Sequence, residues 1–261
     1  MTLFFHEIRK NRIALLIWTF AIAFMLGVTI VIFPEMEKEM GEMENLMSNM
    51  GAFSDAFGMN KINFSEFIGY FGIECGNVLG LGGALFAATA GAMALSSEEA
   101  NHTAEFLLSH PIKREKVIGL KLLSVISQIT ILNLVVLGIV MGLTAAIITK
   151  PPYNTMLLIF AAYYVMQLII AFICFGISAF LKNGAIGIGI GVGFLFYIVN
   201  IISNLTEDLE FLKHLTPFSF ADSSEIIQNN SLPTKYLALV VVMAILGVVL
   251  AFVKYTKKDI A

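Results

Sequence analysis

The chain alternates between long apolar runs and short polar segments, and this alternation predicts its architecture. Six of the runs reach or nearly reach the ~20 consecutive apolar residues that an α-helix needs to cross a bilayer. At ~1.5 Å per residue, each of them spans most of the ~30 Å hydrocarbon core. The predicted membrane-spanning helices are Ile13–Phe33, Phe67–Leu95, Leu122–Ile148, Thr155–Leu181, Gly184–Ser203 and Tyr236–Val253.

The composition agrees with this pattern of apolar runs. Hydrophobic residues make up 58% of the chain and charged residues only 13%, against about 25% charged residues in an ordinary globular domain. The first apolar run is too long for the central part of a signal peptide, so we expect it to be kept as a helix. Cys75 and Cys174 lie inside apolar runs, where cysteine serves as a small buried hydrophobic residue. The sequence therefore predicts an all-α membrane protein with a single transmembrane domain over residues 1–261.

The distribution of lysine and arginine predicts which helix ends face the cytosol, because cytosolic loops carry an excess of these residues. With the N-terminus inside, eleven of the 16 basic residues lie on the cytosolic side and five on the outer side. Both termini are therefore expected in the cytosol. The basic residues are scattered among helix ends, which excludes the basic patch of a nucleic-acid-binding protein. The cytosolic set is Arg9, Lys10, Arg12, Lys113, Arg114, Lys116, Lys121, Lys182, Lys254, Lys257 and Lys258, and the outer set is Lys38, Lys61, Lys150, Lys213 and Lys235.

Two outer, extracellular segments are longer than tight turns. Residues 34–66 interleave Met and Leu with Glu, which is typical of a short amphipathic helix outside the bilayer. Within this segment, Asn63 and Glu66 have the spacing of a capping box that opens the second span. Residues 204–235 are interrupted at Pro217 and fit either a short helix or a re-entrant hairpin.

The fifth span begins with GAIGIGIGVG, which holds two overlapping G-x-x-x-G pairs, Gly187 with Gly191 and Gly189 with Gly193. This spacing allows helix backbones to approach closely in a bilayer. A packing surface is the simpler interpretation, and a helix that lines a pathway or a dimer seam is the alternative.

Catalytic motifs are largely missing from the sequence. The chain has no G-x-x-x-x-G-K-[ST] motif, so we expect it not to hydrolyse nucleotides itself. Its four His residues are spread over separate segments, which argues against a catalytic metal site. Glu98 and Glu99 match half of the E-E-x-x-x-R signature of intramembrane glutamic proteases, but Thr103 stands where Arg is expected. An intramembrane protease is therefore the weakest alternative.

Glu74 is the one carboxylate inside a predicted span. An ionisable group in lipid is a functional hypothesis by default, so a secondary transporter or channel that uses Glu74 is a second alternative. The simpler interpretation is a residue near the membrane interface that is hydrated or bonded to a neighbour such as Asn77.

The most specific segment is the polar loop between the second and third spans, residues 96–121. The pattern predicts an extension of the second span up to Glu99, a short amphipathic helix over Asn101–Ser109, and a stop at Pro111, because the residue before a proline is pushed out of helical conformation. Basic residues then lead into the third span, where they can meet anionic lipid headgroups.

This loop resembles the one between helices 2 and 3 of the ABC type-2 permease family, the membrane subunits of ABC exporters. The family pattern reads E-x-x-x-x-T-x-E-x-L-L-x-x-P-[IV]-x-R, followed by a Lys near the start of helix 3. Six spans, cytosolic termini and a polar N-terminus extend the resemblance over the whole chain. The matching residues here are Glu98, Thr103, Glu105, Leu107, Leu108, Pro111, Ile112, Arg114 and Lys121.

The resemblance implies a mechanism. A short coupling helix in the loop would dock on a separate ABC ATPase, present in two copies, which binds the ATP and Mg; this chain itself would hold no cofactor. Residues 1–12 would form an amphipathic elbow helix on the inner leaflet, with Phe5, Glu7 and Arg9 as its characteristic residues. The implied coupling residues are Glu98, Glu99, Thr103, Glu105, Phe106, Leu108, Pro111 and Arg114.

The resemblance also implies partners and a location. A second permease copy or a sister permease would complete the transporter in the plasma membrane, in a bacterial setting. The uniformly apolar spans favour an amphipathic, peptide or lipid-like cargo over a small ion.

Overall fold

The computed structural model describes residues 2–48, 62–63, 65–103, 112–205 and 207–258. Within these ranges the chain forms helices joined by turns, and six helices are long and apolar enough to cross a membrane. The predicted all-α fold with six spans is confirmed. The spans are α1 (Thr2–Ser48), a composite of α3 (Phe67–Cys75), η2 (Gly76–Leu81) and α4 (Gly82–Ala100), then α6 (Arg114–Ile147), α7 (Tyr153–Ser178), α8 (Ala185–Leu205) and α10 (Leu237–Lys257).

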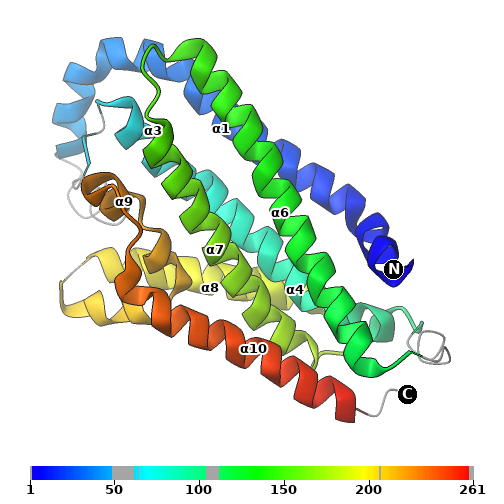
Figure 1. Cartoon of the computed structure of the whole chain (residues 1–261). Coiled ribbons are helices and arrows are strands. Elements are labelled where there is room, and N and C mark those ends of the chain that lie inside the picture. The colour runs from blue at the N-terminus through cyan, green and yellow to red at the C-terminus, as the bar shows by residue number, and fades with distance from the viewer. Residues whose placement is uncertain (1, 49–61, 64, 104–111, 206, 259–261) are drawn as a thin grey trace.

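The helices form a bundle with α4 and α7 at its centre. α4 packs most extensively against α7 and α8, while α1 packs along α6 and α10 packs along α7. Figure 1 shows both termini at one end of the bundle and α9 (Ser223–Asn229) at the other. An even number of spans places the two termini on the same side of a membrane, and the lysine and arginine distribution predicts that this side is the cytosol.

Glycines set the closest crossings between helices. A Cβ added at Gly91 of α4 would lie 2.3 Å from the carbonyl oxygen of Ala171 in α7, and one added at Gly247 of α10 would lie 2.4 Å from that of Phe172. Only glycine fits such contacts. The close approach increases the van der Waals contact that holds helices together in lipid.

The two glycine pairs of α8 have different surroundings. A Cβ added at Gly189 would lie 2.9 Å from the carbonyl oxygen of Ala88, and one at Gly193 would lie 2.9 Å from the side chain of Leu85. In the part of the chain that the structure describes, nothing lies within 4 Å of a Cβ added at Gly187 or Gly191. The first pair therefore packs α8 against α4, and the second pair leaves an open strip on α8.

The predicted break between an elbow helix and the first span is absent from the N-terminal helix α1. The residues of the predicted elbow form the first turns of α1, which runs without interruption from Thr2 through Pro34 to Ser48. The sequence between Thr2 and Pro34 contains one glycine and no proline, so nothing ends the helix at residue 12. Part of the predicted 34–66 segment is thus also an extension of α1, and Figure 1 shows this light-blue end curving over the bundle.

The second span begins differently from the expected capping box. Glu66 is the N-cap of α3, and its side chain makes no capping hydrogen bond. The Asn63 amide instead donates to the Glu66 carboxylate at 3.0 Å, and the Asn63 side-chain oxygen accepts from the Ser65 backbone N–H. The two side chains pair with each other, and neither reaches the first backbone N–H groups of the helix.

A π-helical segment, η2, interrupts the second span at its midpoint. The Gln167 amide of α7 donates to the Leu79 carbonyl oxygen of η2 at 3.4 Å, and the Asn133 amide of α6 donates to the Gln167 side-chain oxygen at 2.6 Å. Gln167 is fully buried. These bonds pair the Gln167 amide group and the Asn133 amide nitrogen inside the bundle, where an unsatisfied polar group is costly, and they connect three spans at one level.

The segment between α8 and α10 folds back against the bundle. It contains η3 (Glu207–His214), η4 (Pro217–Ala221), α9 and η5 (Thr234–Tyr236). All five residues of η4 are buried, and the Thr216 hydroxyl donates to the Phe196 carbonyl oxygen of α8 at 2.9 Å. Asp222 caps α9 by accepting the Ser224 backbone N–H. Of the two expected forms, the structure shows the short helices, and they pack against the bundle.

The α8 glycines provide a matched test of this packing. The G189V substitution should lower the thermal midpoint of the chain in detergent, because overpacking a close contact costs about 1–3 kcal/mol. The G191V substitution should leave the midpoint unchanged, since its side chain would meet open space. The thermal midpoint of each variant is measured by heating samples and quantifying the remaining folded protein by size-exclusion chromatography. Equal shifts in the two would contradict the assigned orientation of α8.

Candidate functional site

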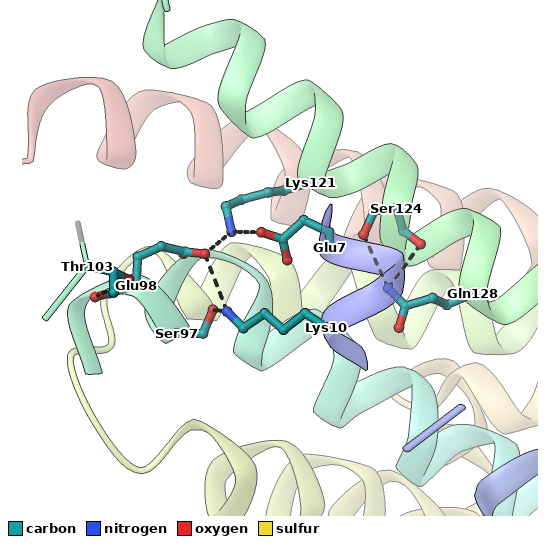
Figure 2. Close-up of polar contacts among 8 residues, drawn as sticks. All are labelled: Glu7, Lys10, Ser97, Glu98, Thr103, Lys121, Ser124 and Gln128. Carbon is teal, nitrogen blue, oxygen red and sulfur yellow. Dashed lines mark hydrogen bonds and ion pairs between the residues drawn. The ribbon is translucent and has the colours of Figure 1, made fainter. Parts of the chain in front are cut away.

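At the end of the bundle that holds both termini, charged side chains from three helices meet (Figure 2). Glu7, Glu98 and Lys121 are buried, and Lys10 is exposed at their edge. Lys121 of α6 is 1% exposed, and its Nζ lies 2.9 Å from Oε1 of Glu7 and 2.5 Å from Oε1 of Glu98. The Lys10 ammonium lies 3.6 Å from the same Glu98 oxygen and donates to the Ser97 hydroxyl at 2.9 Å. We name Glu7, Lys10, Glu98 and Lys121 the charge cluster.

The charge cluster balances its own charge, with two carboxylates against two ammonium groups. This balance matters because an ion taken out of water unpaired costs several kcal/mol. The residues come from three helices: Glu7 and Lys10 lie one turn apart on α1, Glu98 lies near the end of α4, and Lys121 lies two turns into α6. The cluster therefore ties α1 to both helices that flank the loop at residues 101–113.

A second set of contacts, the C-terminal anchor of Glu99, Arg114 and Lys258, ties the same loop to the end of α10. The Lys258 ammonium lies 2.6 Å from Glu99 Oε1, as an ion pair whose angles fall outside hydrogen-bond geometry, and it donates to the Leu181 carbonyl oxygen at 3.1 Å. Lys258 thereby connects α4 with the turn between α7 and α8.

Arg114 completes the anchor at the C-terminal end of α10. One guanidinium nitrogen donates to the carbonyl oxygens of Tyr255, Thr256 and Lys258 at 3.4, 3.1 and 2.7 Å. The last carbonyl groups of a helix lack partners within the helix and carry its partial negative charge. A guanidinium at this position satisfies them, so the first residue of α6 holds the end of α10.

The loop starts with a tight reversal. After α4 ends at Ala100, the Thr103 backbone N–H donates to the Glu98 carbonyl oxygen at 2.8 Å, and His102 adopts a left-handed backbone with φ 54°. The chain therefore turns back at once instead of prolonging α4.

The predicted coupling residues divide into two groups. Glu98, Glu99, Thr103 and Arg114 belong to the charge cluster, the anchor and the reversal, and they contact this chain itself. The other four lie outside the described residues: Glu105, Phe106, Leu108 and Pro111. Of the predicted elbow residues, Glu7 is buried in the charge cluster, while Phe5 and Arg9 are exposed.

The pairing of Lys121 with Glu7 is a feature that the sequence did not reveal. The sequence marked Lys121 as a residue that meets lipid headgroups and Glu7 as part of an elbow. One indication was available, because each residue lies within two turns of the membrane end of an apolar run, and a buried charge there requires a partner of opposite sign. The buried Lys258 carries the same indication.

The geometry does not support the two alternative functions, an intramembrane protease that uses Glu98 and Glu99 and a secondary transporter or channel that uses Glu74. Glu98 and Glu99 are each paired with a lysine, as expected of structural carboxylates. Glu74 is partly exposed on α3, and Asn77 accepts a hydrogen bond from Tyr197 at 3.4 Å. Among the described residues, no group of three or more His, Cys, Asp or Glu side chains could hold a metal ion.

Comparison with known families identifies the class of the chain. A family model described as ABC-2 family transporter protein matches residues 1–260. The chain therefore belongs to the ABC-2 transporter family, and the resemblance found in the loop at residues 96–121 is confirmed at the level of the family. A search of curated proteins and a search of solved structures each found no significant match.

The charge cluster predicts a steep penalty for losing its central lysine. The K121M substitution leaves Glu7 and Glu98 buried without their main partner, and breaking a buried pair in this way costs about 3–5 kcal/mol. We expect a clearly lower thermal midpoint in detergent than for the wild type. The exposed neighbour Lys116 provides the control, since K116M should leave the midpoint unchanged. A K121M midpoint equal to that of K116M would show that the cluster does not stabilise the fold.

Proposed function

We propose that this chain is the permease subunit of an ABC exporter in which a separate ATPase drives the membrane helices through the loop at residues 101–113. The observation that carries the proposal is the double anchoring of this loop. The charge cluster joins its two flanking helices to α1, and the C-terminal anchor joins them to α10.

The anchoring determines which helices would move when the ATPase displaces the loop. A loop held only by its own backbone would absorb a displacement by bending. Here the flanks are joined to α1 and α10 through ion pairs that are shielded from water, where electrostatic interactions are strengthened. A displacement of the loop would therefore move the ends of α1, α4, α6 and α10 together.

The partners follow from the same proposal. Two ATPase subunits on the cytosolic side would bind ATP and Mg, and each would dock against the coupling segment that the sequence predicts around Glu105 and Phe106. A second permease copy or a sister permease would complete the pathway, and the open strip of Gly187 and Gly191 on α8 offers a place for close helix contact between subunits. The assembly would lie in the plasma membrane of a bacterium.

The cargo class has its own support. A groove of about 580 Å³ between α1 and α6 is lined almost entirely by apolar side chains and opens on the outside of the bundle. Apolar grooves of this kind suit the chain of a lipid or the apolar face of a peptide. We propose an amphipathic, peptide or lipid-like cargo that moves outward.

A charge-free variant separates coupling from folding. The triple substitution E7Q/E98Q/K121M removes the ion pairs without leaving an unpaired buried charge, and such replacements are often neutral for stability. We expect the variant to fold and to co-purify with its ATPase. Stimulation of ATP hydrolysis by the permease should fall about tenfold, within the range of typical coupling energies.

Hydrolysis by the purified complex measures this effect, with E115Q/K116M as an exposed control that should behave as the wild type. Full stimulation in the charge-free variant would refute transmission through the charge cluster.

Docking on the ATPase has a separate test. The E105A/F106A variant should insert into the membrane normally but lose most of the co-purifying ATPase, because a docked helix depends on a few apolar and charged contacts. Pull-down through a tag on the permease measures the ratio of the two subunits. An unchanged ratio would refute the assignment of these two residues to the interface.

A further inference from the structure

At the end of the bundle opposite the charge cluster, the structure contains two adjoining polar pockets, which we name the inner and the outer compartment of one cavity. The inner compartment has a volume of about 70 Å³ and is lined by residues of α3, η2, α7, α8 and the η4–α9 segment. The outer compartment has a volume of about 290 Å³ and lies between α8, α9 and η5. Both are lined by Asn200, Asn204, Asp222 and Ser224.

The inner compartment has the chemistry of an ammonium site. Asp222 is the one charged side chain among its described lining residues, and the aromatic rings of Tyr163, Tyr197 and Phe218 line the same space. A carboxylate beside aromatic rings attracts an organic cation through charge and through cation–π contacts. A metal ion fits less well, because the described residues contain no group of three or more His, Cys, Asp or Glu side chains that could hold one.

The position of Asp222 is fixed by the fold. Its Oδ1 accepts hydrogen bonds from the Ser224 backbone N–H at 2.9 Å and from the Ser224 hydroxyl at 2.5 Å. Ser223 pairs with the Tyr163 hydroxyl at 2.8 Å, which holds the start of α9 against α7. The carboxylate is thus oriented before any ligand arrives, and a ligand would not have to order it.

The outer compartment adds charges of both signs. Lys213 and Lys235 line it together with Asp222 and Glu225. The Ser219 hydroxyl also lines this compartment and is buried without a hydrogen-bond partner among the described residues. A ligand whose ammonium group sits at Asp222 could therefore place an attached anionic group near the lysines. The combined arrangement fits a small zwitterion.

We propose that this cavity binds a phosphoethanolamine group, with the ammonium in the inner compartment and the phosphate in the outer one. The group has two sources, a soluble phosphoethanolamine and the headgroup of phosphatidylethanolamine in the adjacent leaflet. The site is independent of ATPase coupling, so its failure would leave the proposed function intact.

Protection of an introduced cysteine tests the site. The N200C variant places a thiol on the wall shared by both compartments, while the native Cys75 and Cys174 are 0% and 1% exposed. The full chain is placed in phosphatidylglycerol nanodiscs and labelled with a water-soluble maleimide. Labelling is followed without a probe, with soluble O-phosphoethanolamine, and with phosphatidylethanolamine added to the nanodisc.

The D222N substitution in the N200C background separates binding from folding. Asparagine retains the N-cap of α9, so the variant should fold, but it removes the charge that attracts the ammonium. We expect protection to require a roughly tenfold or higher probe concentration, as for the loss of a charged hydrogen-bond partner. E115Q, at the opposite end of the bundle, is the matched control and should retain full protection.

The outcomes are distinct. Protection by the soluble probe supports a site for a free zwitterion, and protection by the lipid alone supports a headgroup site. Absence of labelling in N200C, absence of protection by both probes, or equal protection in D222N would overturn the proposal.

Discussion

The burial of Lys121 between Glu7 and Glu98 is the interaction on which the packing of α1, α4 and α6 depends, at the end of the bundle that holds both termini. A lysine that is 1% exposed can exist there only with partners of opposite charge. Those partners come from helices at the beginning and the middle of the chain, so α1, α4 and α6 must meet at this point. The C-terminal anchor then adds α10 to the same unit through Arg114 and Lys258.

The rest of the bundle is held by a different kind of contact. Where lipid supplies no hydrophobic drive between helices, association depends on close packing and on polar bonds inside the bundle. Gly91 and Gly247 allow α4 and α10 to approach α7 at backbone distance, and Gln167 connects α7 to the π segment of the second span. The contacts thus differ along the molecule. Ion pairs hold the helices together at the end with the two termini, and small residues allow them to pack closely in the middle.

The apolar runs allowed the six spans to be predicted from sequence, but hydropathy marks only the part of a helix that lies in lipid. The third span was expected from Leu122, whereas α6 begins at Arg114, because charged helix-forming residues continue the helix into water. For the same reason, α1 continues through the polar residues before the first span, and the predicted break after residue 12 was wrong. The π segment could not be predicted, because GNVLGL reads as an ordinary apolar helix.

The charge pairs were beyond sequence reasoning for a geometric reason. Lys121 is separated from Glu7 by 114 positions, and only the packing of α1 along α6 brings them together. The loop pattern predicted that Glu98, Thr103 and Arg114 couple the chain to an ATPase, whereas the contacts that the structure describes for them lie within this chain.

Distance measurements between spin labels test the central claim most directly, namely that the ends of α1 and α6 move as one unit. Labels at the exposed positions Arg9 and Lys116 would report on this pair in the proposed complex with an ATPase, before and after ATP is trapped. The account predicts an unchanged distance between the two labels, while the distance between the Lys116 positions of the two permease copies changes. A change in the distance between positions 9 and 116 on ATP trapping would contradict it.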